Sequence, residues 1–195
     1  MTIQQKIKMT AAQFRDWAVE QPRRYELVDG EPIAMAPERA LHNRVKGLIF
    51  RVFLQIVERD GLACEVFTDG MSVEVPPVGL EGWRNYEPDV SVQCGVVQDL
   101  NSMVLPAPLI VVEMSSPSSR RLDAGSKLTG YTRVASIIHY IVVLPDDRQV
   151  IHHRRQGDGF HTTVHDASAH LLLDPPGMTV DVGSFWPPVQ PEPAT

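Results

Sequence analysis

Three charged residues stand where a divalent metal ion and a phosphodiester could be handled together. Asp89 ends the segment YEPD, Glu113 ends the apolar run LIVVE, and Lys127 follows fourteen residues later. Carboxylate oxygens are the ligands that Mg²⁺ prefers, and a bound divalent ion activates water for attack on phosphorus. An ammonium group offsets the charge of the transition state. If the fold brings these residues together, they form a site for phosphodiester hydrolysis.

The order of the strands gives the two acids a reason to meet. Asp89 lies at the start of a predicted strand, Glu87–Cys94, and Glu113 lies at the end of the next, Leu109–Glu113. If these strands pair antiparallel, both carboxylates reach one edge of the sheet. The backbone carbonyl of Met114 would then be a natural further oxygen ligand.

Lys127 is predicted on a helix that runs to about Ala135, after the strand-breaking segment SSPSS. Asp123 and Tyr131, four residues before and after the lysine, share one helical face with it. Asp123 would position Lys127 as an i,i+4 partner. Gly130 costs this helix about 1 kcal/mol relative to alanine, so close packing of helix on sheet would explain its presence.

Other elements follow from hydrophobic spacing and turn residues. The helix His42–Glu58 has an apolar face, with Arg44, Lys46, Arg51 and Glu58 on its other faces. The segment Pro76–Arg84 is predicted as a loop. The remaining expectations are a helix over Thr10–Glu20, a hairpin over Tyr25–Met35 turning at Asp29-Gly30, strands near Ala63–Phe67, Met71–Val75, Ile137–Leu144, Gln149–Arg154 and Thr162–Val164, and an apolar patch at Leu171–Leu173.

The ordered motifs resemble the Uma-type putative restriction endonuclease family, within the PD-(D/E)XK nuclease-like superfamily. They are Glu-Pro-Asp, then Val-Val-Glu-x-x-Ser-Pro-Ser, then Asp-x-x-x-Lys-x-x-x-Tyr. The opening segment RYELVDGE, His42 at the head of the long helix and the segment YIVV also fit. The resemblance extends from about Met9 to Trp186. Each motif alone is weak, and their order makes the resemblance specific.

The resemblance implies an α/β fold with a restriction-endonuclease-like core, in which helices flank a central mixed β-sheet, preceded by an N-terminal helix and hairpin. It implies Mg²⁺- or Mn²⁺-dependent hydrolysis of nucleic acid, with DNA as the expected substrate. Asp89, Glu113 and the Met114 carbonyl would be the metal ligands.

Lys127 would replace the lysine that the family pattern has two positions after the second acid, because this chain has Ser115 there. Glu26 and His42 match recurrent polar positions and would line the pocket. By analogy with nucleases that cut two strands with two sites, a homodimer is expected.

Length and composition indicate one domain over residues 1–186, followed by a loose Pro-rich tail over 187–195. The 195 residues are 43% hydrophobic, and no apolar stretch is long enough to span a bilayer. The N-terminus MTIQQKIKMT has no apolar signal region, so a cytoplasmic protein is expected. Cys64 and Cys94 lie in mostly apolar surroundings, which predicts buried thiols and no disulfide.

The net charge of −6 argues against a non-specific nucleic-acid coat, because such binding depends on phosphate neutralisation. It does not exclude a nuclease, since net charge averages over local patches. The basic clusters at 120–133 and 152–155 are either substrate contacts or solvated faces. An alternative therefore stays open: a nuclease-fold protein that does not cut and serves as a binding or assembly module.

Overall fold

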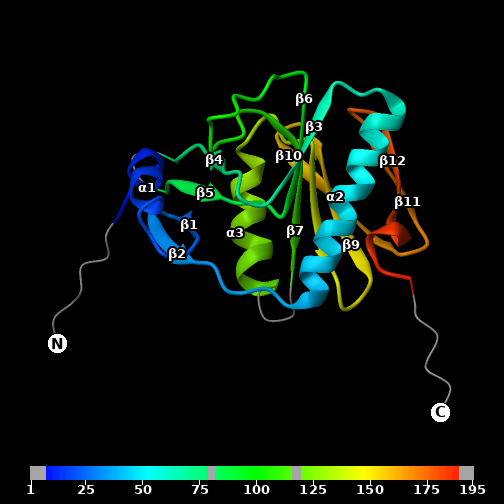
Figure 1. The fold of residues 1–195 in the computed structure, drawn as a ribbon, viewed down its shortest axis with the longest axis horizontal. Coiled ribbons are helices and arrows are strands. Elements are labelled where there is room, and N and C mark those ends of the chain that lie inside the picture. The colour runs from blue at the N-terminus through cyan, green and yellow to red at the C-terminus, as the bar shows by residue number, and fades with distance from the viewer. Residues whose placement is uncertain (1–7, 79–81, 116–119, 189–195) are drawn as a thin grey trace, which may run out of the picture.

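The computed structural model describes residues 8–78, 82–115 and 120–188, and for 120–124 it describes the backbone alone. The expected strand break at 116–119 and the end of the expected tail, 189–195, lie outside the described residues. A six-stranded sheet occupies the centre, in the order β10-β9-β8-β7-β6-β3 (Figure 1). Its strands are β3 (Cys64–Thr68), β6 (Val90–Cys94), β7 (Pro108–Met114), β8 (His139–Leu144), β9 (Gln149–Gln156) and β10 (Gly159–Asp166).

The sheet is mixed because one connection in it is a helical crossover. β7 and β8 run parallel, and α3 (Arg120–Thr132) joins them, as a parallel pair requires. The other neighbouring pairs of this sheet are antiparallel. The expected mixed α/β architecture is confirmed.

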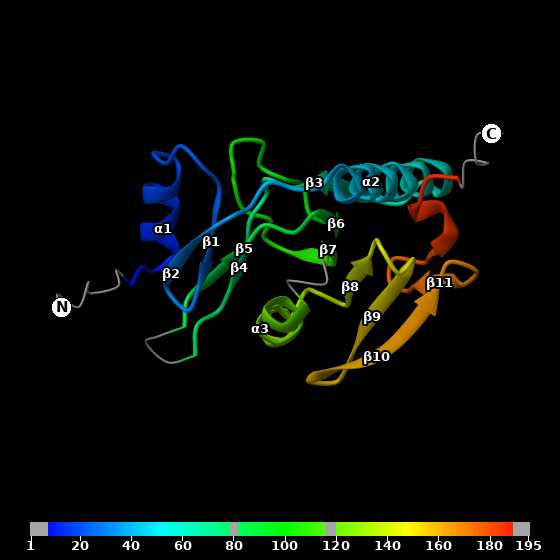
Figure 2. The ribbon, with the colours of Figure 1, turned by 90° about the horizontal axis from the view of Figure 1, so that it is seen from below.

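The long helix α2 (Ala40–Asp60) covers one face of this sheet, and α3 covers the other (Figure 2). Alternation along the strands sorts the side chains between the two faces. Val112 and Ile141 belong to the core under α2, whereas Val111 and Tyr140 belong to the core under α3. The chain thus has two buried apolar layers, one on each side of the strands.

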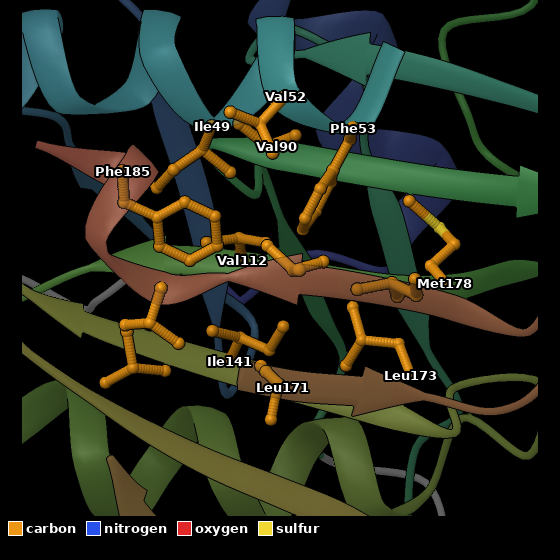
Figure 3. Packing of buried hydrophobic residues seen from close by; sticks show 14 of the residues in the cluster. Ile49, Val52, Phe53, Val90, Val112, Ile141, Leu171, Leu173, Met178 and Phe185 are labelled. Carbon is orange, nitrogen blue, oxygen red and sulfur yellow. The ribbon is translucent and has the colours of Figure 1, made fainter. Parts of the chain in front are cut away.

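In the core under α2, the helix packs against strands and against a small C-terminal hairpin (Figure 3). Phe53 of α2 meets Phe185 edge to face, with ring centroids 6.0 Å apart. Phe185 ends the 3₁₀ turn η1 (Val182–Phe185), which follows the hairpin of β11 (His170–Leu173) and β12 (Met178–Asp181). The sequence indicated only the apolar patch at Leu171–Leu173, because β12 is too short to stand out from its turn-rich surroundings.

A second, four-stranded sheet has the order β2-β1-β5-β4 and lies beside α3 (Figure 2). Its strands are β1 (Tyr25–Val28), β2 (Glu31–Ala34), β4 (Val73–Val75) and β5 (Arg84–Tyr86), and the helix α1 (Ala11–Ala18) precedes them. The hairpin turn is confirmed: Asp29 and Gly30 both have positive φ, 50° and 80°, as a type I′ turn requires.

The assignment of Arg84 to a loop was wrong. β5 is a strand because β1 and β4 pair with it on either side, with Leu27 opposite Asn85 and Val73 opposite Tyr86. These partners are distant in sequence, so a three-residue strand has no local signal.

The prediction of free buried thiols was also wrong, because Cys64 and Cys94 form a disulfide. The two residues face each other directly across the antiparallel pair β3–β6. They are thirty residues apart in sequence, and only the register of two strands brings them together. Among the described helices, none is long and apolar enough to cross a bilayer.

Gly130 lets α3 approach the second sheet closely, as its place in the helix predicted. A Cβ atom added there would lie 2.7 Å from a ring carbon of Tyr86, whose side chain is fully buried. Gly125, one turn and a half earlier on the same helix, has open space around the position of a Cβ atom.

We therefore expect opposite effects from the same substitution. Gly130→Ala should destabilise the protein by about 1–2 kcal/mol, because overpacking outweighs the gain in helix propensity. Gly125→Ala should stabilise it by up to about 1 kcal/mol. Urea unfolding followed by circular dichroism measures both. Equal effects of the two substitutions would contradict the close approach at Gly130.

Candidate active site

The pairing of β6 with β7 brings the two predicted acids together. Val90 lies opposite Val112, so Asp89 and Glu113 are the next pair beyond the ladder. The Asp89 N–H donates to the Val112 carbonyl over 3.0 Å, and the Met114 N–H donates to Asp89 Oδ2 over 2.6 Å. The antiparallel arrangement predicted from strand order is confirmed.

Glu113 faces α3 because it alternates with Val111, which belongs to the core on that side. The residue is only 6% exposed, and both of its carboxylate oxygens accept hydrogen bonds. The Tyr131 hydroxyl donates to Oε1 over 2.7 Å, and the Lys127 ammonium donates to Oε2 over 2.9 Å. Helix α3 therefore presents Lys127 and Tyr131, four residues apart, to one carboxylate.

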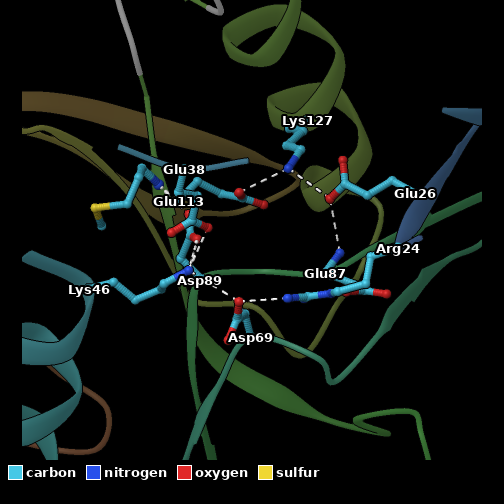
Figure 4. A network of polar contacts seen from close by, with 10 residues as sticks. Arg24, Glu26, Glu38, Lys46, Asp69, Glu87, Asp89, Glu113 and Lys127 are labelled. Atoms are coloured by element: carbon cyan, nitrogen blue, oxygen red, sulfur yellow. Dashed lines mark hydrogen bonds and ion pairs between the residues drawn. The ribbon is translucent and has the colours of Figure 1, made fainter. Parts of the chain in front are cut away.

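Lys127 also bonds Glu26, which β1 brings from the second sheet (Figure 4). Its Nζ lies 2.9 Å from Glu26 Oε1, and the same oxygen accepts the N–H of Glu87 over 3.0 Å. The ring of Tyr86 lies below the ammonium, with its centroid 5.5 Å from Nζ. Glu26, predicted to line the pocket, is thus in direct contact with the predicted lysine.

The end of α3 is held by Arg155 of β9. Its guanidinium donates to the carbonyls of Tyr131, Thr132 and Val134 and to that of Ile137. Tyr131 and Thr132 are the last two residues of α3, and the last carbonyls of a helix lack their i+4 donors, so the arginine caps it. Arg155 thus positions the helix that carries Lys127. The neighbouring His152 and His153 are buried, so the segment 152–155 is not a solvated basic face.

A second group of charged residues borders the first, and sequence reasoning missed it (Figure 4). Lys46 of α2 is 5% exposed, and its ammonium contacts three carboxylates. The distances from Nζ are 2.6 Å to Glu38, 3.1 Å to Asp69 and 3.3 Å to Asp89. Arg24 closes the group by bonding both Asp69 and Glu87.

The assignment of Lys46 to a face of α2 other than the apolar one was wrong, although the sequence did contain a signal for it. It stands three residues before Ile49 and seven before Phe53, both fully buried, so it continues the apolar stripe of α2. A lysine on such a stripe needs buried acidic partners. Those partners lie on three other segments of the chain, and their convergence could not be predicted.

One predicted supporting residue, His42, does not join the site as expected, and another, Asp123, is not tested by the structure. The His42 ring bonds Arg39 over 3.0 Å, and Arg39 pairs with Asp146. Within the described residues, no hydrogen bond or ion pair links His42 to the two acids or to Lys127. The side chain of Asp123 lies outside the described residues, so its pairing with Lys127 stays a prediction.

Burial shapes the protonation of this site. Burial acts to lower the pKa of Lys127, but Glu113 and Glu26 raise it well above its ordinary value, so the ammonium form is favoured. Burial raises the pKa of Asp89, against the Met114 N–H and Lys46. Burial likewise raises the pKa of Glu113 to about 8, and Glu26 and Asp89 add to that effect while Lys127 opposes it.

A cavity of about 890 Å³ opens beside Lys46. Arg23, Arg24, Glu38, Asn43 and Asp69 also line it. Lys46 therefore lies between this cavity and Asp89, which it contacts on its other side. Its lining carries both charge signs, which suits a polar ligand.

The donor chemistry of the site fits a hard divalent cation. The network of described residues contains six carboxylates and three cationic side chains. The carboxylates belong to Glu26, Glu38, Asp69, Glu87, Asp89 and Glu113, and the cations to Arg24, Lys46 and Lys127. The Met114 N–H points to Asp89, and in an extended strand the carbonyl of the same residue points to the same side. Among the described residues, no three His, Cys, Asp or Glu side chains already surround one metal position. Ammonium groups lie between these carboxylates instead.

The fold belongs to the restriction-endonuclease-like class. A crystal structure of a protein from Anabaena variabilis, described as a putative nuclease belonging to DUF820, superposes with a TM-score of 0.71. The match covers 91% of this chain and 97% of that chain, at 17% sequence identity.

The chain itself belongs to the Uma2 family, described as putative restriction endonucleases, whose profile matches residues 11–182. Two uncharacterized proteins of Synechocystis sp. are similar along their length. The protein slr1290 is 24% identical over 181 residues, covering 92% of each chain. The protein sll1609 is 25% identical over 153 residues, covering 77% of this chain and 82% of its own.

The bond between Tyr131 and Glu113 generates a prediction. Tyr131→Phe removes a donor from a buried carboxylate and should cost about 1–3 kcal/mol in the free energy of unfolding. Tyr25→Phe, at a half-buried tyrosine whose ring packs edge to face on Trp17, should change it by less than about 0.5 kcal/mol. Urea unfolding measures both values, and a Tyr131→Phe cost as small as the control would contradict the bond.

Proposed function

We propose that this protein is a metal-dependent nuclease that hydrolyses phosphodiester bonds of nucleic acid. One observation supports the proposal above all, which is that Asp89 and Lys127 both lie beside Glu113. Lys127 forms a 2.9 Å ion pair with Glu113, and the antiparallel register of β6 and β7 places Asp89 opposite it. Membership of a family described as putative restriction endonucleases supports the same activity. DNA is the proposed substrate on that ground, and a homodimer is the proposed assembly for cutting two strands.

Asp89, Glu113 and the Met114 carbonyl would hold the ion, Mg²⁺ or Mn²⁺. When bound, such an ion lowers the pKa of a coordinated water and polarises the phosphoryl oxygens. All three groups are oxygen donors, and the acid surplus around them attracts a divalent cation.

The protein's own side chains would do the remaining work. Lys127 would orient the attacking water and place its positive charge against the phosphate in the transition state. Glu26 would hold the ammonium from the second sheet, and Tyr131 would fix the second oxygen of Glu113. Each of these groups is held by a bond to another, so little reorganisation is needed when substrate binds.

A second candidate function is a binding or assembly module with a nuclease fold that does not cut. The net charge of −6 favours it, because a long nucleic acid repels an acidic surface. This module would bind a protein partner and would need no metal ion. Metal uptake and cleavage separate the two functions.

The first test of the nuclease is metal binding. Isothermal titration of the wild type with Mn²⁺ should show uptake, and Asp89→Asn should abolish it, because a neutral amide is a poor ligand for a hard cation. Glu58→Gln, at an exposed acid on α2, is the matched control and should bind as the wild type does. Absence of uptake by the wild type would end the enzyme proposal.

The second test is the role of Lys127. Lys127→Met should reduce cleavage of plasmid DNA by at least about 100-fold, because the transition state loses a preorganised positive charge. Mn²⁺ uptake should persist, and circular dichroism checks that the variant is folded. Unreduced cleavage would remove the lysine from the mechanism.

The third test is pH dependence. Because burial raises the pKa of Glu113 to about 8, this carboxyl is protonated at lower pH, and the protonated form does not bind a divalent ion. Affinity for Mn²⁺ should therefore rise as pH increases through about 8 and level off above it. Titrations at several pH values between about 6.5 and about 9 measure the trend. An affinity independent of pH over this range would contradict the raised pKa.

A further inference from the structure

The two oxygens of Asp89 have different partners. Oδ2 accepts the Met114 N–H over 2.6 Å, which fixes the carboxylate against β7. Oδ1 faces the Lys46 ammonium at 3.3 Å. The oxygen that remains for a metal ion is therefore the one next to a cation of the protein itself.

Lys46 does not depend on Asp89 for its place. Its shorter contacts are to Glu38 at 2.6 Å and to Asp69 at 3.1 Å. Burial acts to lower the pKa of Lys46, but Glu38, Asp89 and Asp69 together raise it, so the side chain stays charged. The lysine can thus release Asp89 and remain paired.

We propose that Lys46 is a tethered cation that competes with the divalent metal ion for Asp89. Uptake of the ion would displace the ammonium toward Glu38 and Asp69, which line the 890 Å³ cavity. Lys46 would in this way set the metal affinity of the site. The inference rests on the proposed function, because it takes Asp89 as a metal ligand.

Electrostatic repulsion predicts that the Lys46 ammonium lowers the affinity of Asp89 for a metal ion. A charge at 3.3 Å from a carboxylate oxygen in a poorly solvated site interacts strongly with it, and a second cation arriving at that oxygen is repelled. Removing the ammonium removes this repulsion and frees the oxygen. A lysine that served only to stabilise the fold would have the opposite effect, because its loss would loosen the acids and weaken metal binding.

The test is Mn²⁺ titration of Lys46→Met beside the wild type. We expect the variant to bind Mn²⁺ at least about tenfold more tightly. Lys46→Arg keeps the positive charge and should bind as the wild type does. Arg44→Met removes a charge from an exposed position of the same helix and should leave the affinity unchanged.

A second variant, for which the opposite change in Mn²⁺ affinity is expected, keeps the proposal testable if Lys46→Met does not fold. Glu38→Gln weakens the shortest of the ion pairs of Lys46. The ammonium should then interact more strongly with Asp89, and the affinity for Mn²⁺ should fall. Thermal unfolding of each variant accompanies the titrations. Tighter binding by Lys46→Met, or weaker binding by Glu38→Gln if the first variant does not fold, supports the proposal. Unchanged or reversed affinities overturn it.

The outcomes also separate this inference from the nuclease proposal. If the wild type takes up no Mn²⁺ but Lys46→Met takes up one ion, Lys46 is the competing cation and the nuclease proposal fails. If neither protein binds Mn²⁺, both proposals fail. If both bind with equal affinity, only the role of Lys46 is rejected.

Discussion

The site depends on the burial of one carboxylate. Glu113 ends an apolar strand and is 6% exposed, so its charge needs partners inside the protein. Lys127 and Tyr131 supply them from one face of α3. This requirement fixes the rotation of the helix against the central sheet, and Gly130 permits its close approach to Tyr86 of the second sheet. The contacts that hold α3 against the central sheet are therefore the same contacts that position the charged groups of the site.

Around this centre the protein places more acid than base. The helices α3 and α2 lie on opposite faces of the central sheet, and each contributes a lysine to the acid pair. Lys127 of α3 forms an ion pair with Glu113, and Lys46 of α2 forms one with Asp89. Such a site is stable without an ion because ammonium groups neutralise part of its charge. It also retains negative charge that favours a divalent cation. The two lysines therefore differ in expected role: one serves the reaction, and the other regulates entry of the ion.

Local pattern was a good guide where an element is defined by its own residues. The Asp29-Gly30 turn, the long helix predicted over His42–Glu58 and the apolar strand that carries Glu113 were all predicted and are present. Elements stabilised by distant partners were missed. The strand β5 exists because β1 and β4 pair with it, and Cys64 meets Cys94 only through the β3–β6 register. No spacing within the chain encodes either contact.

By itself, the sequence determined the order of the central strands and of the helices, and with it the antiparallel meeting of Asp89 with Glu113 and the helical spacing of Lys127 and Tyr131. These follow from strand polarity and helix periodicity, which are local properties of a chain. Only the tertiary structure decided that Lys46 is buried, that Glu26 bonds Lys127 and that His42 pairs with Arg39 instead of the acids. Each of these is a contact between segments far apart in the chain, and its geometry depends on how whole layers pack.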